Sequence, residues 1–249
     1  MGEAIGVVVP VHDEQERLDR CLGALARAAA HPDLAGVPLH VFTVLDRCRD
    51  HSADIAVRWE VAFALRSAVE GGSGGAAVAS RLHVVELNAG NVGAARAMGC
   101  AAVLEEVADL EASALWLATT DADSVVPPHW LAHQLALHRA GIRAWAGTVR
   151  VEDWAQQPGA VADWFDGDYR AGPGHDHVHG ANFGVQGSAY LSGGGFSALR
   201  SSEDVALRDA LVRAGIPVLA GCGAPVVTSA RREARAPDGF AEALRTQKP

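Results

Sequence analysis

A single lysine, Lys248, occurs among the 249 residues of the chain. The phosphate-binding loop GxxxxGK[ST] is therefore excluded, because it requires a lysine that no internal segment supplies. Thirty Asp and Glu residues outnumber 21 Lys and Arg residues, which gives a formal net charge of −9. A chain with this balance lacks the basic surface that binds phosphate backbones, so we expect no nucleic-acid partner.

Cysteines and long apolar runs are also scarce. The four cysteines are far apart in the chain and form no CxxC pair. This spacing indicates neither a disulfide framework nor a structural zinc site, and reduced thiols are typical of a cytosolic protein. The longest stretch without Asp, Glu, Lys or Arg, residues 178–199, is interrupted by glycines, and the N-terminus is acidic rather than basic. We expect a cytoplasmic protein without a transmembrane segment or signal peptide.

Short apolar runs alternate with stretches of helical periodicity in the first part of the chain. The pattern predicts strands at 5–9, 39–45, 81–87 and 114–119, and helices at 14–30, 52–69, 92–107 and 127–140. Four strand-then-helix units in succession are typical of an α/β fold with an open, mostly parallel sheet flanked by helices. A glycine-rich segment at 71–75 predicts a flexible loop.

The pattern is less regular after residue 143. We expect a strand at 143–151, an extended segment at 178–185, a helix at 202–214 and short apolar segments at 216–219 and 226–228. No internal repeat or linker separates two independent units. The chain is therefore predicted to be one domain over 1–249, with a nucleotide-type first half (1–125), an elaborated second half (126–230) and a tail (231–249).

Polar side chains follow all four predicted strands at the point where each ends. In chain order they are Asp13, Glu14, Asp46, Asn88, Asp121 and Asp123, and Pro10 precedes them at the end of the first strand. Because ligands bind outside the carboxyl ends of the strands in open α/β sheets, four polar strand ends predict one shared ligand site. The alternative, that these residues merely cap the following helices, explains any one of them but not all four together.

Two of these segments carry specific chemistry. In the Asp-x-Asp triplet, Asp121 and Asp123 lie two apart and point the same way on an extended backbone. Paired carboxylates suit Mg²⁺ or Mn²⁺, although such a triplet also occurs in ordinary turns. The segment Asn88 to Arg96 carries glycines and opens a helix, whose N-terminus favours anions, and Arg96 is placed to hold a phosphate. Its structural alternative is a glycine turn with a solvated arginine.

Glu203 and Asp204 follow Ser202 at the start of a predicted helix. Ser202 as the N-cap, with acids in the first turn, is the ordinary explanation, yet a carboxylate at a helix start can also serve a cleft as a general base. His175, His177 and His179 alternate and share one face of an extended segment. They are candidates for metal ligation, for the lining of a substrate cleft or for packing.

The C-terminal segment 229–235 contains three arginines on an otherwise acidic protein. It is suited to closing over donor phosphates, to attracting a phosphorylated acceptor, or to peripheral contact with an anionic membrane surface. A solvated tail explains the same residues.

Six segments in order resemble the family 2 glycosyltransferases, which have the GT-A nucleotide-sugar-binding fold. They are VVVPVHDEQERLDRCL, TVLDRCRDHSADIA, NAGNVGAARAMG, TTDADSVVPPHWL, VHGANFGVQGSAYLSGGGF and SSEDVALRDAL. The likeness spans about residues 5–229. It departs from the family at Asp13, where Asn is usual, and after Asp46, where a second Asp and Gly are common. The absence of a QxxRW motif argues against a processive polysaccharide synthase.

The resemblance implies a role for each matched position. Pro10, Asp13, Glu14, Asp46, Asn88, Arg96 and Asp121 would border the nucleotide; Asp123, with Asp121, would bind the metal. Gly180, Ala181, Asn182 and the preceding His179 would lie by the donor sugar and acceptor; Asp204, paired with Glu203, would be the catalytic base.

The implied activity is metal-assisted transfer of a sugar, with inversion, from a nucleoside-diphosphate sugar to a hydroxyl group. The expected cofactor is Mg²⁺ or Mn²⁺. The expected partners are a UDP-sugar donor and a small-molecule, glycan or lipid acceptor. One alternative is a sugar-1-phosphate nucleotidyltransferase, but those enzymes usually carry a glycine- and arginine-rich loop after the first strand, where this chain is acidic. The other alternative is an inactive homologue that retains the nucleotide site.

Overall fold

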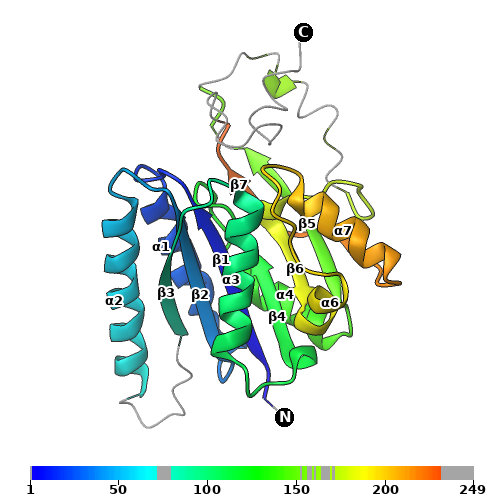
Figure 1. Cartoon of the computed structure of the whole chain (residues 1–249), viewed down its shortest axis with the longest axis horizontal. Coiled ribbons are helices and arrows are strands. Elements are labelled where there is room, and N and C mark those ends of the chain that lie inside the picture. Colours follow the sequence, from blue (N-terminus) through cyan, green and yellow to red (C-terminus); the bar gives the residue numbers. More distant parts are fainter. Residues whose placement is uncertain are drawn as a thin grey trace.

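The computed structural model describes residues 2–71, 80–151, 153–155, 159, 161–163, 169 and 172–230. Within them, seven strands form one sheet in the order β3-β2-β1-β4-β6-β5-β7 (Figure 1). The strands are β1 (Ala4–Val11), β2 (Leu39–Asp46), β3 (Ser80–Leu87), β4 (Leu115–Thr119), β5 (Ala144–Val151), β6 (Phe183–Gln186) and β7 (Leu219–Thr228). All neighbouring strands are parallel except β6, which is antiparallel to both β4 and β5.

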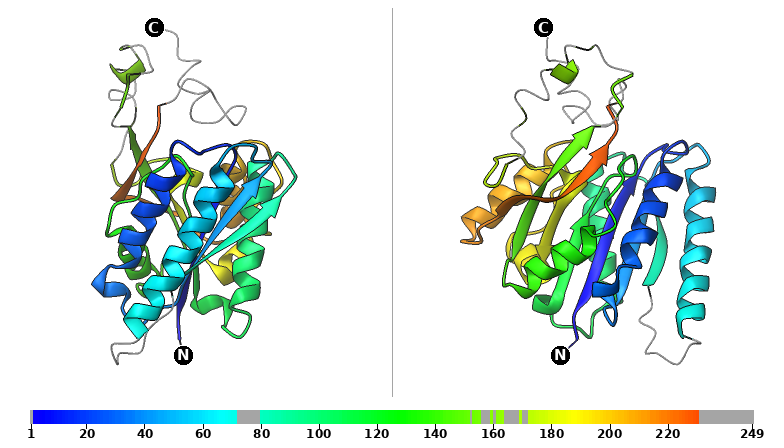
Figure 2. Two further views of the ribbon diagram at one scale, coloured as in Figure 1. Left: turned by 90° about the vertical axis from the view of Figure 1, so that its left-hand side faces the viewer. Right: turned by 180° about the vertical axis from the view of Figure 1, so that it is seen from behind.

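Helices cover both faces of this sheet (Figure 2). The α-helices are α1 (Leu18–Ala29), α2 (Ser52–Gly71), α3 (Val92–Glu106), α4 (Trp130–Arg139), α6 (Gly187–Ser192) and α7 (Glu203–Arg213). Buried side chains of α1, α2 and α4 join one hydrophobic cluster with β1 and β2. Those of α3, α6 and α7 join a second cluster on the opposite face. The predicted fold class, an open and mostly parallel sheet flanked by helices, is therefore confirmed.

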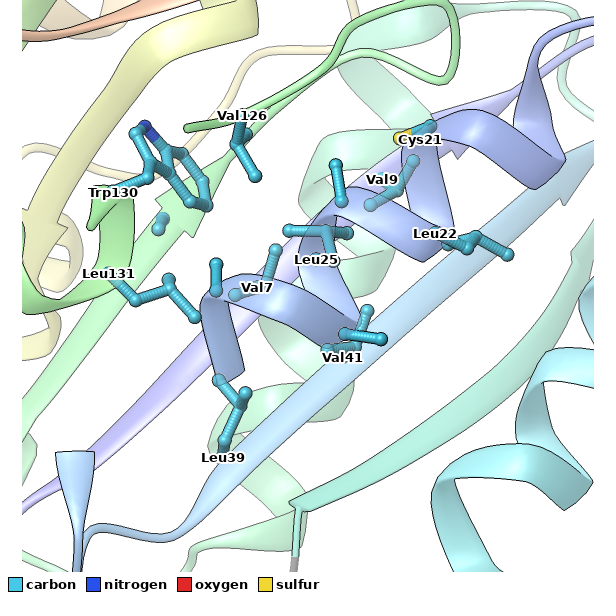
Figure 3. Close-up of a cluster of buried hydrophobic side chains, with 14 of the residues drawn as sticks. Val7, Val9, Cys21, Leu22, Leu25, Leu39, Val41, Val126, Trp130 and Leu131 are labelled. Atoms are coloured by element: carbon cyan, nitrogen blue, oxygen red, sulfur yellow. The ribbon is translucent and has the colours of Figure 1, made fainter. Parts of the chain in front are cut away.

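The close-up of the first cluster shows why β1 has no polar side chains (Figure 3). Val7 and Val9 of β1 face Leu22 and Leu25 of α1, and all four side chains are fully buried. Alternate residues of β1, such as Val8, belong to the cluster on the other face. Since both faces of the strand are covered, its sequence reads as a continuous apolar run instead of an alternating one.

Several predicted boundaries need correction. The first helix begins at Leu18 and the fourth at Trp130, because residues 14–17 and 127–129 form turns before them. The expected extended segment 178–185 contains a 3-10 turn, Gly180–Asn182, before the short strand β6, and α6 follows it unpredicted. The apolar segments at 216–219 and 226–228 were expected to be separate, but β7 runs from Leu219 to Thr228. The two apolar segments flank a stretch rich in glycine and alanine, and such small residues do not show the periodicity that predicts a strand.

Two predicted segments fall largely outside the described residues. They are the glycine-rich loop, except for Gly71 at the end of α2, and the C-terminal tail with the arginines of segment 229–235. Among the helices that the structure describes, none is both long enough and apolar enough to cross a membrane.

Candidate active site

The carboxyl ends of β2, β1 and β4 lie next to one another, in that order. Neighbouring strands are about 4.8 Å apart, and β1 alone separates β2, which ends at Asp46, from β4, which ends two residues before Asp121. The loops after these strands and the start of α7 meet at this edge through the contacts described below. The predicted convergence of strand-end polar residues on one edge is therefore confirmed by the strand order.

Asp46 has a role that the sequence did not predict. Its side chain is only 4% exposed, and its Oδ1 accepts hydrogen bonds from the N–H groups of Ala89 and Gly90, both at 2.8 Å. Its Oδ2 accepts from the N–H of Asn91 at 2.7 Å, and Asn91 in turn caps α3 by accepting from Ala94 N–H. The anion at this glycine turn is thus a carboxylate of the protein itself. The expected contact of Asp46 with a nucleotide base must compete with these three hydrogen bonds.

The other predicted nucleotide-side residues also hold the loops of this edge together. Asp13 has a left-handed backbone (φ 52°), and its Oδ1 accepts from Arg49 N–H at 2.6 Å. The N–H of the buried Glu14 donates to Ser52 Oγ at 2.8 Å. Asn88 Oδ1 accepts from Arg47 Nε at 2.8 Å. Pro10 lies one residue before the end of β1, opposite Val44 of β2.

Arg96 forms the centre of the second half of the site. Its side chain is 3% exposed and makes ion pairs with Asp121, at the end of β4, and with Glu203, at the start of α7. Glu203 is 4% exposed, whereas Asp121 remains 38% exposed. The guanidinium therefore links the end of β4 to the start of α7, where Glu203 lies 107 residues after Arg96 in the chain. The alternative of a solvated arginine is wrong, because Arg96 is buried between two carboxylates; its contact with a phosphate stays a prediction.

Negative charge exceeds positive charge around this guanidinium. Asp121 also interacts with the charges of Asp123, Glu203 and Asp204. Burial, together with these three carboxylates, raises the pKa of Asp121 to about 6, although Arg96 acts in the opposite direction. A site with one buried cation and four carboxylates favours a further cation or a proton.

Asp204 lies on the side of this cluster that faces the 3-10 turn. Its Oδ2 accepts a hydrogen bond from Gly180 N–H at 2.6 Å, and its Oδ1 accepts from Val205 N–H at 2.8 Å. The carbonyl oxygen of Gly180 accepts from Thr119 Oγ1 at 2.7 Å. A Cβ atom at Gly180 would overlap the guanidinium of Arg96, so only glycine fits between the turn and the ion pairs. Gly180 thus positions Asp204 directly.

Ser202, the residue before α7, does not cap the helix as expected. Its backbone is left-handed (φ 57°), and its side chain makes no capping hydrogen bond. The other described non-glycine residues with positive φ are Arg47, directly after β2, and Asp13, two residues after β1; both strands end at this edge. Such backbone conformations concentrate at functional sites, where surrounding contacts hold them in place.

Asp123 lies beside a cavity of about 200 Å³. Its Oδ1 accepts from Ser124 Oγ at 3.3 Å and its Oδ2 from Ser229 Oγ at 2.8 Å. These bonds leave lone pairs on both oxygens, and hard carboxylate oxygens fit Mg²⁺ or Mn²⁺. Other polar side chains that line the cavity are those of Glu16, Arg17, Arg20 and Asp153. No sequence signal pointed to Ser229, except that it begins the basic segment 229–235.

The position of the loop Gly180–Asn182 by the donor sugar and acceptor stays a prediction, but the structure shows what its side chains contact. Asn182 is completely buried: its Nδ2 donates to the carbonyl oxygens of Thr148 and Ala224, and its Oδ1 accepts from Trp130 Nε1 at 2.7 Å. Ala181 is 5% exposed. These two side chains therefore fix the turn from inside, while the backbone N–H of Gly180 donates to Asp204.

The three alternating histidines share one face, as predicted, because the rings of His175 and His177 stack, as do those of His177 and His179. In the described part of the chain they do not form a group of three metal-ligating atoms. Tyr169 accepts a hydrogen bond from Val149 N–H at 2.9 Å, so its own hydroxyl hydrogen is directed to His179 Nε2 at 3.0 Å. Burial lowers the pKa of His179 to about 4, which agrees with a neutral ring.

The fold and the site define a class of proteins, the GT-A nucleotide-sugar transferases. One solved structure of this class is S. aureus TarS in complex with UDP-GlcNAc; it shares 12% identity, with 99% of this chain and 62% of that chain covered (TM-score 0.60). Another is the mannosyltransferase PcManGT from Pyrobaculum calidifontis with GDP-Man and Mn²⁺, at 15% identity, 100% and 66% coverage and TM-score 0.65. This chain thus spans somewhat less than two thirds of the length of these structures.

At the level of sequence, the profile of glycosyl transferase family 2 matches residues 6–178. The chain belongs to this family. A comparison with curated proteins finds no match. The resemblance inferred from the six sequence segments is therefore confirmed at the level of family and fold.

Proposed function

We propose that the protein transfers a sugar, with inversion, from a nucleoside-diphosphate sugar, most suitably a UDP-sugar, to a hydroxyl group of an acceptor. The observation that carries this proposal is the cluster around Arg96. Asp121 and Asp123 at the end of β4, and Glu203 and Asp204 at the start of α7, bring four carboxylates to the edge of the sheet where ligands bind in α/β folds.

Asp204 is the general base in this proposal. The N–H of Gly180, in the turn Gly180–Asn182, and the N–H of Val205, in α7, hold its carboxylate, which fixes the direction from which it approaches an acceptor. The acceptor oxygen forms a bond to the anomeric carbon as the bond to the diphosphate oxygen breaks. Asp204 takes the hydroxyl proton, and the nucleoside diphosphate leaves from the opposite face. A single displacement of this kind inverts the anomeric configuration.

Arg96 acts as a positioning residue and not as a phosphate ligand. Because it is buried between Asp121 and Glu203, it fixes the start of α7 and hence Asp204. Asp123, with Asp121, would hold Mg²⁺ or Mn²⁺, which supplies positive charge to the leaving diphosphate. The structure of PcManGT contains Mn²⁺ together with a nucleotide sugar, in agreement with this choice of metal.

The donor lies, in this proposal, across the ends of β1, β2 and β4. The loops that carry Pro10, Asp13, Glu14 and Asn88 border the nucleotide, and those of His179 and Gly180 border the sugar and acceptor. One similar solved structure is a complex with UDP-GlcNAc and another a complex with GDP-Man, so the assay includes donors with either base.

The test is an assay of purified protein with labelled UDP- and GDP-sugars and Mn²⁺ that measures nucleoside diphosphate release. Asp204→Asn is expected to keep donor binding and to lose about 10²–10⁴-fold in transfer. Asp123→Ala is expected to lose the Mn²⁺-dependent part of nucleotide binding. Asp209→Asn, an exposed acid on the same helix that pairs with Arg208, is the matched control and should transfer normally.

Three results would contradict the proposal. Release of pyrophosphate would identify a nucleotidyltransferase, and nucleotide binding without any turnover of donor would identify an inactive homologue. Transfer by Asp204→Asn at the wild-type rate would show that Asp204 is not the general base.

A further inference from the structure

Three potential metal ligands meet at the edge of the sheet opposite the candidate active site. His40 lies in β2, His83 in β3, and Glu106 is the last residue of α3. His40 is six residues before Asp46 on the same strand, so it lies about 20 Å from the carboxyl end of β2. His40 and His83 are diagonal neighbours on one face of the sheet, since His40 pairs with Arg81 and His83 with Phe42. The active site therefore does not account for this group.

The spacing of these side chains matches that of ligands around one small ion. His40 Nδ1 lies 3.5 Å from His83 Nε2 and 3.6 Å from Glu106 Oε1. The third pair is within 4.8 Å. In a tetrahedral zinc site with bonds of about 2.0–2.2 Å, neighbouring ligand atoms are about 3.3–3.6 Å apart. Two of the three separations already have this value, so rotation of side chains alone can admit the ion.

The surroundings favour a cation with nitrogen ligands. Phe42 stacks on the His83 ring at 4.4 Å, which fixes its plane. Glu106 ends α3, whose last turn contains no basic residue, and a helix C-terminus attracts positive charge. Of the charged groups that influence the pair, Glu60 and Glu106 favour a cation and Arg81 opposes it.

We propose that His40, His83 and Glu106 form a zinc site that joins β2, β3 and α3. Two imidazoles and one carboxylate suit Zn²⁺, whereas Mg²⁺ prefers oxygen ligands alone, and water completes the fourth position. The three ligands come from segments 43 and 66 residues apart, and they include the edge strand β3. Because Zn²⁺ would bind here only to the folded chain, it would raise the stability of that state by mass action.

The experiment uses the full chain, freed of metal and held in excess Mg²⁺ so that the carboxylate site is saturated. Calorimetric titration with Zn²⁺ is expected to give one equivalent, a raised melting temperature, and, with Co²⁺ instead, the visible absorption of a four-coordinate site. His83→Gln should weaken Zn²⁺ binding by at least about 100-fold, since even outer-shell changes cost up to that factor. Glu106→Gln, at a more exposed position, provides a second variant whose folding is not at risk.

His31→Gln is the matched control, because His31 lies 3.8 Å from Asp33 and belongs to no group of three potential ligands among the described residues; this variant should bind Zn²⁺ as the wild type does. Unchanged Zn²⁺ affinity in both His83→Gln and Glu106→Gln would overturn the proposal. Loss of Zn²⁺ binding in Asp123→Ala, with binding retained in His83→Gln, would also overturn it by locating the ion at the active site.

Discussion

Replacement of Arg96 tests whether a buried ion-pair bridge determines the geometry of the site. Arg96→Met keeps most of the side-chain volume but removes the guanidinium, which leaves Glu203 buried at 4% exposure without its partner. Removal of one member of a buried ion pair costs about 3–5 kcal/mol. Asp121 is 38% exposed, and water replaces much of its interaction, so we expect a loss near the lower end, about 3 kcal/mol.

Urea unfolding followed by circular dichroism measures this loss as a lower midpoint at constant m-value. Arg139→Met is the matched control. Arg139 pairs with Glu3 at the surface, where it is 49% exposed, and exposed pairs contribute at most about 1 kcal/mol. The double variant Arg96→Met/Glu203→Leu should recover part of the stability, because it removes the uncompensated carboxylate together with the cation.

The bridge also predicts a kinetic result. If Arg96 positions Asp204 and does not bind phosphate, Arg96→Met should lower kcat much more than it raises KM for the donor. The reasoning is refuted if Arg96→Met costs no more stability than Arg139→Met. It is also refuted if the double variant is no more stable than Arg96→Met alone.

Three further predictions concern the residues around this bridge. Gly180→Ala should lower the free energy of unfolding by about 1–3 kcal/mol and abolish transfer, because its Cβ would overlap the Arg96 guanidinium. The control is Gly172→Ala, where a Cβ meets nothing within 4 Å; it should be neutral in the same unfolding and transfer assays. Asp46→Asn should lower the free energy of unfolding by about 1–3 kcal/mol and speed hydrogen exchange at Ala89 to Asn91. The reason is that an amide offers one acceptor oxygen where three N–H groups bind. Exchange as slow as in the wild type would contradict this prediction. His179 has a folded-state pKa of about 4, below its ordinary value of 6.5. Its contribution to stability is therefore complete above about pH 6.5 and is lost as the pH falls toward 4. Over this range the unfolding free energies of the wild type and His179→Gln should converge by at most about 3 kcal/mol.

The sequence by itself determined the fold class and the edge of the sheet at which the site lies. Runs such as Ile5 to Val9 are apolar on both faces, and each is followed by a helix, which together require a covered parallel sheet. Polar residues at Asp46 and Asp121 then fall at the carboxyl ends of the strands for topological reasons alone. These inferences needed only local periodicity and the handedness of strand–helix–strand connections.

Only the tertiary structure decided which polar side chains have hydrogen-bond or ion-pair partners within the protein. Arg96 and Glu203 are 107 residues apart, and Asp46 and Gly90 are 44 apart, so no local pattern indicates that they pair. Asn182 likewise reads as a loop residue beside a ligand, yet it is the hydrogen-bonded centre of a buried turn. Partners of this kind are selected by packing and by the cost of burying an unpaired polar group, and both depend on the whole fold.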